Sequence, residues 1–134
     1  MRRLAAALAA LALAPAVAAC GGDSPPPPED QVRETLTGYG RAVEAKDYDA
    51  LCTRYLSPDL VERVNSIGLP CPAALRRGLG EVEDPRLTVG RIEVAGDRAT
   101  AQVSTSAAGE QPSRDTVELQ RVEGSWRLTS LGEE

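Results

Sequence analysis

The hydrophobic pattern of the chain predicts helices first and strands afterwards. From residue 29 onwards, apolar side chains recur at spacings of four, three and four residues, at Val32, Leu36, Tyr39 and Val43. This spacing places all four on one face of an amphipathic helix. The acidic residues Glu29 and Asp30 suit the positive end of a helix dipole. We therefore predict a long first helix that begins near Glu29.

Two glycines lie inside this predicted helix, at Gly38 and Gly40. A glycine in a helix interior destabilises it by about 1 kcal/mol relative to alanine, because its backbone loses more freedom. Two glycines this close together leave part of the helix surface without side chains. We expect another element to approach the helix closely at this point.

Shorter helical pieces follow the first helix. Apolar residues form short stripes over residues 48–56 and 60–67, and a last piece opens at residues 70–72. Between the stripes, Ser57 provides a helix N-cap, Pro58 suits the first helical position, and Asp59 places an acid in the first turn. These signals predict several short helices before residue 86.

From residue 86 the period changes to two, which is typical of half-buried strands. Leu87 and Val89 alternate, whereas Ile92 and Val94 continue on the opposite parity, with Gly90 between the two pairs. A glycine at such a switch indicates a β-bulge. Turns at 96–97 and 123–125 and a longer connection at 106–113 divide the region into about four strands. Strands that follow helices predict an α+β domain with an antiparallel sheet.

The first twenty residues have the layout of an export signal. Arginines precede an apolar run, and small residues precede a cysteine. Val17-Ala18-Ala19-Cys20 resembles the lipobox of bacterial lipoproteins, which implies cleavage before Cys20 and a diacylglycerol on its sulfur. Two alternatives are an uncleaved membrane helix, for which the run is short, and ordinary cleavage that leaves a free Cys20.

This resemblance divides the chain into a signal peptide at 1–19, a lipidated cysteine with a Gly/Pro-rich tether at 20–28, and a single domain at 29–134. Prolines in the tether favour an extended spacer. The protein is then exported and held on the bacterial membrane, facing away from the cytoplasm.

Cysteine counting supports this arrangement. The chain has three cysteines, an odd number for an exported protein. Lipid on Cys20 leaves Cys52 and Cys71, for which a disulfide is the expected state outside the cytoplasm. Closing such a loop stabilises a fold by about 3 kcal/mol. The alternative is a pair of buried free thiols.

Composition excludes several classes of function. The net charge is −5, and an acidic domain repels phosphate backbones, so we expect no nucleic-acid partner. The chain has no histidine, which removes Ser-His-Asp and Cys-His catalytic systems and most zinc sites. No phosphate-binding loop or calcium-binding pattern occurs. We expect no metal and no cofactor.

The order of the elements, together with "IEVAGDRATAQV" and "VELQRVEGSWRLTSL", resembles the nuclear transport factor 2-like superfamily, over residues 30–132. More narrowly, it resembles small secreted and lipoprotein members from high-GC bacteria. The resemblance implies a cone-shaped domain in which a curved sheet wraps the first helix and leaves a cavity at its open end. Some members bind small ligands, some are isomerases or dehydratases, and many associate with partners. A cystatin-like sheet with one long helix is the neighbouring alternative.

Four residues are candidates for a site. Asp115 shares the parity of Val117 and Leu119 and is a weak candidate for a general base; the alternative is a solvated strand start. Candidate ligand contacts are Tyr39, Tyr55 and Trp126, each of which also suits plain packing in the core.

Three hypotheses follow from these candidates. The first is a non-enzymatic envelope lipoprotein that binds a small apolar ligand or another envelope protein. The second is an isomerase-like or dehydratase-like enzyme that uses Asp115 with a tyrosine. The third is a docking module with an exposed apolar sheet face.

Overall fold

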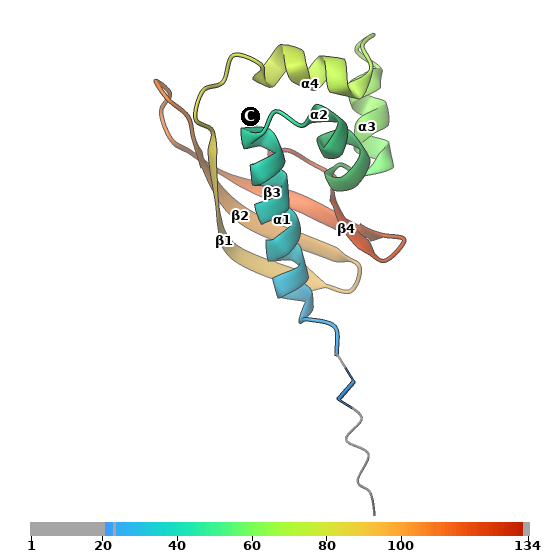
Figure 1. The fold of residues 1–134 in the computed structure, drawn as a ribbon. Helices are drawn as coiled ribbons and strands as arrows, with labels where there is room; N and C mark the ends of the chain where they lie inside the picture. The colour runs from blue at the N-terminus through green and yellow to red at the C-terminus, as the bar shows by residue number, and fades with distance from the viewer. Residues whose placement is uncertain (1–20, 23, 133–134) are drawn as a thin grey trace, which may run out of the picture.

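The computed structural model describes residues 21–22 and 24–132. The signal peptide, the lipobox Val17-Ala18-Ala19-Cys20 and the lipidation site therefore lie outside the described residues. The described part of the tether, residues 21–22 and 24–27, is exposed and forms neither helix nor strand before the first helix begins. Figure 1 shows this segment leading away from one end of the domain.

The domain consists of a helical first half and a sheet. The elements are, in chain order, α1 (Pro28–Glu44), α2 (Tyr48–Ala50), the π-helical turn η1 (Leu51–Tyr55), α3 (Pro58–Asn65), α4 (Cys71–Leu79), β1 (Arg86–Ala95), β2 (Arg98–Ser106), β3 (Ser113–Val122) and β4 (Ser125–Leu128). The strands form one antiparallel sheet in the order β1-β2-β3-β4. The predicted α+β class and the four-stranded sheet are confirmed.

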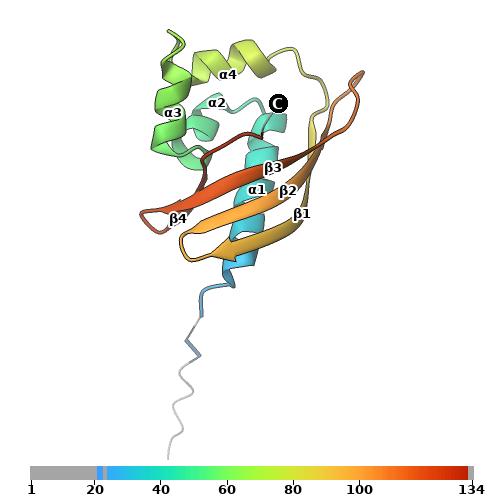
Figure 2. The same ribbon diagram turned by 180° about the vertical axis from the view of Figure 1, so that it is seen from behind.

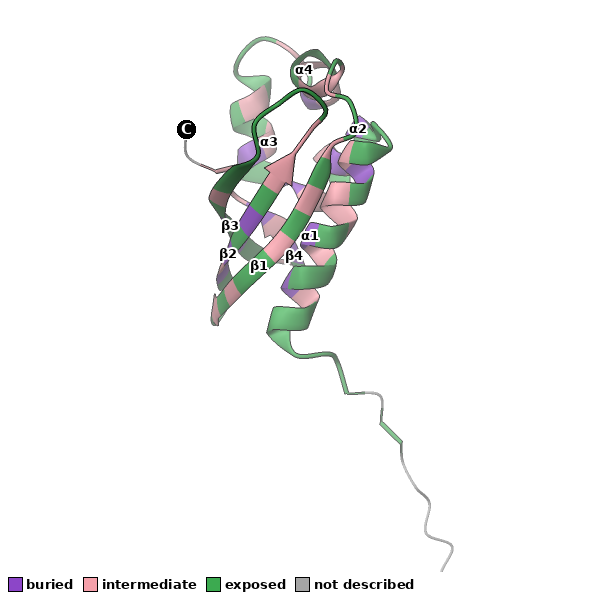
Figure 3. Ribbon diagram, turned by 90° about the vertical axis from the view of Figure 1, so that its left-hand side faces the viewer, coloured by how far each residue is buried: buried purple, intermediate pink, exposed green. Residues whose placement is uncertain are grey.

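The long helix α1 lies across one face of the sheet, which is seen from behind in Figure 2. Its residues Val32 and Leu36 are fully buried because they face the inner side of the strands. Burial alternates along the strands, as Figure 3 shows. The buried inner positions of the sheet are Ala99, Ala101, Val103, Val117, Leu119, Trp126 and Leu128. This core fixes α1 on the sheet and so positions every site described below.

The parity switch in β1 is a β-bulge, as the sequence predicts. Val89 pairs with Val103, and the next pair is Ile92 with Ala101, so β1 has one residue more than β2 between them. The side chain of Arg33 on α1 donates to the carbonyl oxygens of Val89 and Gly90, both at 3.3 Å. These bonds satisfy carbonyls at the bulge and tie the edge strand to α1.

The two glycines of α1 do permit close approach. A Cβ atom at Gly38 would lie 2.6 Å from the hydroxyl of Tyr55, and one at Gly40 would lie 3.2 Å from Cβ of Leu87. Gly38 therefore accommodates η1, and Gly40 accommodates β1. Both contacts fix the distance between α1 and its neighbours on either side.

The short helices differ from the expectation in one place. The predicted stripe at residues 48–56 is one turn of α-helix followed by a π-helical turn, in which the amide of Leu56 donates to the carbonyl of Leu51 at 3.0 Å. The cap of α3 is as the sequence predicts, since the Ser57 hydroxyl accepts from the amide of Leu60 at 3.2 Å.

The structure joins Cys52 and Cys71 in a disulfide, with an S–S distance of 2.01 Å. This bond ties η1 to the first turn of α4.

Strand β4 ends earlier than the sequence suggests. Its alternation continues to Ser130, but the strand stops at Leu128. The hydroxyl of Ser130, rather than a backbone carbonyl, accepts from the amide of Glu118 at 3.1 Å. In addition, the carbonyl of Leu128 accepts from the amide of Ser57 at 2.8 Å, which links the end of β4 to the start of α3.

Among the described helices, none is both long and apolar enough to cross a membrane.

Candidate binding pocket

A partly enclosed pocket lies where the second half of α1 meets the sheet, and we call it the α1–sheet pocket. Its volume is about 330 Å³, within the range of small-molecule sites. Apolar walls come from α1, from the end of α4 and the loop after it, and from β1. The apolar lining residues are Tyr39, Val43, Leu79, Val82, Pro85, Leu87 and Ala107.

The polar side of this pocket includes a short chain of hydroxyl groups, and the other polar lining residues are Arg86, Ser106, Glu110 and Gln111. Thr105 of β2 and Ser113 of β3 are directly opposite each other in the sheet, and their hydroxyl oxygens are 2.8 Å apart. The Ser113 hydroxyl donates to the carboxylate of Asp115 at 2.8 Å, so it accepts from Thr105. Thr105 and Ser113 line the pocket, whereas Asp115 does not.

Tyr39 places an aromatic ring in the wall. Burial raises the pKa of the Tyr39 hydroxyl above its usual value of 10.0, because a phenolate would be poorly solvated there. The ring of Tyr39 meets that of Tyr55 edge to face, with centroids 6.3 Å apart, a favourable geometry for two aromatic rings. The hydroxyl is therefore neutral at physiological pH and can donate one hydrogen bond.

Two loops border the mouth of the pocket. The loop before β1 and the β2–β3 connection are joined by a hydrogen bond from the amide of Ala108 to the carbonyl of Glu83, at 2.9 Å. Next to them, Arg86 forms an ion pair with Glu44 of α1 at 2.9 Å. Both partners are largely exposed, so this pair contributes little to stability. Its position restrains the start of β1 beside the pocket.

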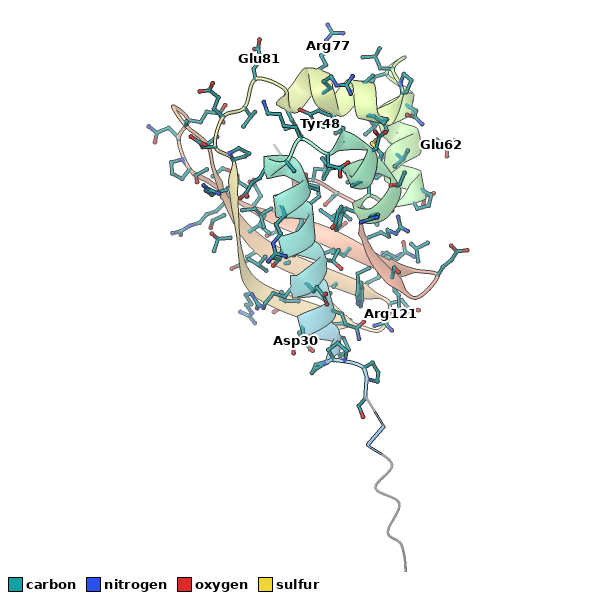
Figure 4. All side chains as sticks on the ribbon, in the orientation of Figure 1. Asp30, Tyr48, Glu62, Arg77, Glu81 and Arg121 are labelled. Atoms are coloured by element: carbon teal, nitrogen blue, oxygen red, sulfur yellow. A yellow bond between two sulfur atoms is a disulfide. The ribbon has the colours of Figure 1, made fainter. Side chains whose placement is uncertain are left out.

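A second, larger hollow lies on the other side of α1, and we call it the α1–β4 groove. It has a volume of about 920 Å³ and is more open than the pocket. One wall is a stripe of α1 that includes Asp30, which lies at the tether end of the helix (Figure 4). The opposite wall comes from η1 and the turn into β4. The charged residues along the groove are Asp30, Arg33, Glu34, Arg41, Arg54 and Arg127.

The structure separates the residues that the sequence singled out. Tyr39 lines the α1–sheet pocket, whereas Tyr55 and Trp126 line the α1–β4 groove. Asp115 faces neither hollow. It has the inner parity of its strand, but a Cβ atom at Gly132 would lie 3.1 Å from Cβ of Asp115, which shows how closely Gly132 packs against it.

Sequence reasoning missed several residues. Thr105 and Ser113 are polar residues on the inner parity of their strands, and that pattern could have identified them. Tyr48 was placed only in a helical stripe, yet its side chain is buried beneath α4 and its hydroxyl has no hydrogen-bond partner in the described part of the chain (Figure 4). No signal in the sequence distinguishes Tyr48 from an ordinary core residue.

The described residues provide no obvious metal site. Across residues 21–22 and 24–132, no three or more His, Cys, Asp or Glu side chains come together in a way that could hold a metal ion. The pocket offers hydroxyl oxygens that can accept hydrogen bonds, and a hydroxyl donor from Tyr39, beside apolar walls. This arrangement can bind and orient a small molecule.

Comparisons with known proteins identify the fold. The sequence matches no protein-family model and no curated protein. Among solved structures, an NTF2-like protein of unknown function from Silicibacter pomeroyi has 20% identity and a TM-score of 0.53, over 75% of this chain and 89% of that chain. A de novo designed NTF2 fold protein has 15% identity and a TM-score of 0.52, over 76% and 84% of the two chains.

A protein from Rhodopseudomonas palustris that contains a SEC-C motif has 20% identity and a TM-score of 0.56, over 79% of this chain and 77% of that chain. At these identities the likeness concerns the fold alone. The domain has the nuclear transport factor 2-like fold, as the order of its elements predicts.

Proposed function

We propose that this protein is a membrane-anchored lipoprotein whose domain binds a small, largely apolar ligand outside the cytoplasm. The observation that supports this proposal is the α1–sheet pocket. Its volume of about 330 Å³ suits a compact molecule, and its apolar walls favour hydrocarbon over charge. The hydroxyls of Tyr39, Thr105 and Ser113 suit a ligand with one or two hydrogen-bonding groups.

The direction of the tether fits an anchored protein that binds ligands from outside. The tether joins α1 at Pro28, whereas the pocket is lined by the same helix from Tyr39 onwards. Eleven residues of α-helix span about 16 Å, at 1.5 Å per residue. A lipid on Cys20 would therefore hold the membrane at the end of α1 opposite the pocket. Ligands would enter from the side that faces away from the lipid.

Binding is a better explanation of the pocket than catalysis. A general base must lie within hydrogen-bond reach of its substrate, and Asp115 is separated from the pocket by Ser113. The one carboxylate among the lining residues belongs to Glu110, in the exposed β2–β3 connection. The enzyme that uses Asp115 and a tyrosine is thus the less favoured function.

A docking module that uses the sheet is also less favoured. Its outer face would have to be apolar to bury against a partner. The exposed strand positions are mostly polar, among them Thr88, Arg98, Gln102, Ser104, Arg114, Thr116, Glu118 and Gln120. Such a face is stable in contact with water.

Ligand binding can be tested with an apolar probe and a blocked pocket. We would titrate the domain with n-octanol and follow backbone amide shifts by NMR. Saturable shifts should appear at residues of the α1–sheet pocket, such as Val43 and Leu87. Val82→Trp would fill the pocket from its wall and abolish these shifts. Ile67→Trp is the control, because Ile67 is 70% exposed and lies outside the pocket, and this variant should keep the shifts. Equal shifts in both variants would contradict the proposal.

The anchor can be tested with labelled fatty acid. In a bacterium that processes lipoproteins, the wild-type chain should incorporate label and its mature form should begin at Cys20. Cys20→Ala should incorporate none, whereas the control Cys52→Ala should incorporate as much as the wild type. Label that persists in Cys20→Ala, or a mature chain that begins at another residue, would refute the anchor.

A further inference from the structure

The α1–β4 groove is lined by two carboxylates near the start of α1 and by several arginines. Asp30 and Glu34 lie on the first turns of α1, together with Arg33, whereas Arg41 lies in the last turn of the helix. Arg54 on η1 and Arg127 on β4 also line the groove. We call Arg41, Arg54 and Arg127 the arginine cluster. These three arginines line one groove in a chain whose net charge is −5.

The arginine cluster has unused capacity for hydrogen bonds. Within residues 21–22 and 24–132, Arg41 and Arg54 form no ion pair and no side-chain hydrogen bond, and both are exposed. Arg127 donates from Nη1 to the carbonyl of Thr53, which holds its guanidinium against η1. Its Nε is buried and has no partner among the described residues. A fixed guanidinium with a free N–H is well prepared to bind an acceptor.

The neighbouring indole adds one more free donor. Trp126 is buried, and its Nε1 has no hydrogen-bond partner in the described part of the chain. The guanidinium of Arg121 stacks over the same ring, 4.8 Å from its centroid, and Figure 4 shows Arg121 towards the tether end of the domain, as it does Asp30. The indole therefore lies next to additional positive charge. Unpaired buried donors are unfavourable and are rare in folded proteins. Here they occur on two adjacent residues that line one groove.

We propose that the α1–β4 groove binds a small soluble anion, with a carboxylate or phosphate group held by the arginine cluster. The arginines and the indole offer many donors, which selects for a ligand rich in acceptors. The rest of such a ligand would lie along Thr37 and Gly38 towards Asp30, where a hydroxyl or amine fits better than a second negative group. This site is separate from the α1–sheet pocket and does not depend on the function proposed for it.

The direction of the groove favours a soluble anion over a lipid headgroup. The tether leaves from the Asp30 end of α1. Arg41 lies about 16 Å further along the helix than Asp30. If the tether fixes the domain on a membrane, the end of the groove with Asp30 and Glu34 faces the lipid surface.

Trp126 provides a direct readout, because it is the only tryptophan of the chain. We would titrate the domain with citrate and with inorganic phosphate, and follow the single indole N–H resonance by NMR. Sodium chloride at matched ionic strength controls for screening. The proposal predicts a saturable shift with at least one anion and none with chloride. A shift that follows ionic strength alone, or no shift with either anion, would overturn it.

Matched arginine variants locate the site. Arg41→Gln and Arg54→Gln should each weaken anion binding about tenfold, since each removes one charge-assisted contact. Arg77→Gln is the control, because Arg77 is equally exposed but lies on α4, outside the groove. Equal affinity in all three variants would refute the assignment. Vesicles that contain phosphatidylglycerol should leave the indole resonance unchanged; a shift with vesicles and not with citrate or phosphate would replace the soluble anion by a lipid.

Discussion

Gly38 offers a quantitative test of how α1 packs against η1. Gly38→Ala should improve the intrinsic stability of the helix by about 1 kcal/mol, because alanine is the better helix former. The new methyl group, however, would lie 2.6 Å from the hydroxyl of Tyr55 and 3.0 Å from its Cε1. Overpacking of this kind destabilises a core by about 1–3 kcal/mol. The variant should therefore be neutral to about 2 kcal/mol less stable.

The chain contains a matched control for this prediction. Gly78 also lies inside a helix, α4, but a Cβ atom there would meet nothing within 4 Å. Gly78→Ala should thus gain about 0.5–1 kcal/mol. The two variants should differ by about 1–3 kcal/mol in free energy of unfolding, measured by urea denaturation. In thermal melts, 1 kcal/mol corresponds to about 4–8 °C for a domain of this size.

A second substitution identifies the cause of the difference. Tyr55→Phe removes the oxygen that lies nearest the new methyl group but leaves the ring in place. The double variant Gly38→Ala/Tyr55→Phe should therefore regain part of the loss, relative to Tyr55→Phe alone. If Gly38→Ala stabilises the domain as much as Gly78→Ala, the close contact between α1 and η1 is not present in solution.

Three further predictions concern stability. Reduction should lower the free energy of unfolding by about 3 kcal/mol, whereas Cys52→Ala/Cys71→Ala should melt at the same temperature with and without reductant; a reductant-insensitive wild type would exclude the disulfide. Ser57→Ala should lose about 1 kcal/mol in urea titrations, because the amide of Leu60 loses its cap; an unchanged midpoint would show that this cap contributes nothing. The pKa of Tyr39 is raised in the folded state. The contribution of its neutral hydroxyl to the free energy of unfolding is therefore complete below pH 10.0 and is lost as the pH rises above that value. Chemical denaturation between about pH 9 and 11 should show a steeper loss for the wild type than for Tyr39→Phe, and equal slopes would argue against burial of the hydroxyl.

Periodicity predicted those parts of the fold that depend on local geometry. The spacing of Val32, Leu36 and Tyr39 determines a helix face, because a helix repeats every 3.6 residues. The parity switch at Gly90 determines a bulge for a similar reason, since side chains alternate strictly along a strand. Both features follow from the backbone and do not require knowledge of the neighbours.

The candidate site was less predictable, because it depends on contacts between distant segments. Asp115 has the parity of a pocket residue, but Gly132 packs against it and Ser113 separates it from the pocket. Trp126 was assigned to packing or to a ligand contact, yet nothing in the sequence showed that its N–H would lack a partner. The arginine cluster combines α1, η1 and β4, which only the folded structure brings together.

The measurement that tests the central claim most directly is native mass spectrometry of the protein extracted from its own membranes. We expect a mature chain that begins at Cys20, carries a lipid, and releases one further small molecule when it is denatured. Val82→Trp should lack that molecule, and Ile67→Trp should keep it. A wild-type protein with the same mass before and after denaturation, or a molecule that Val82→Trp retains, would contradict ligand binding in the α1–sheet pocket.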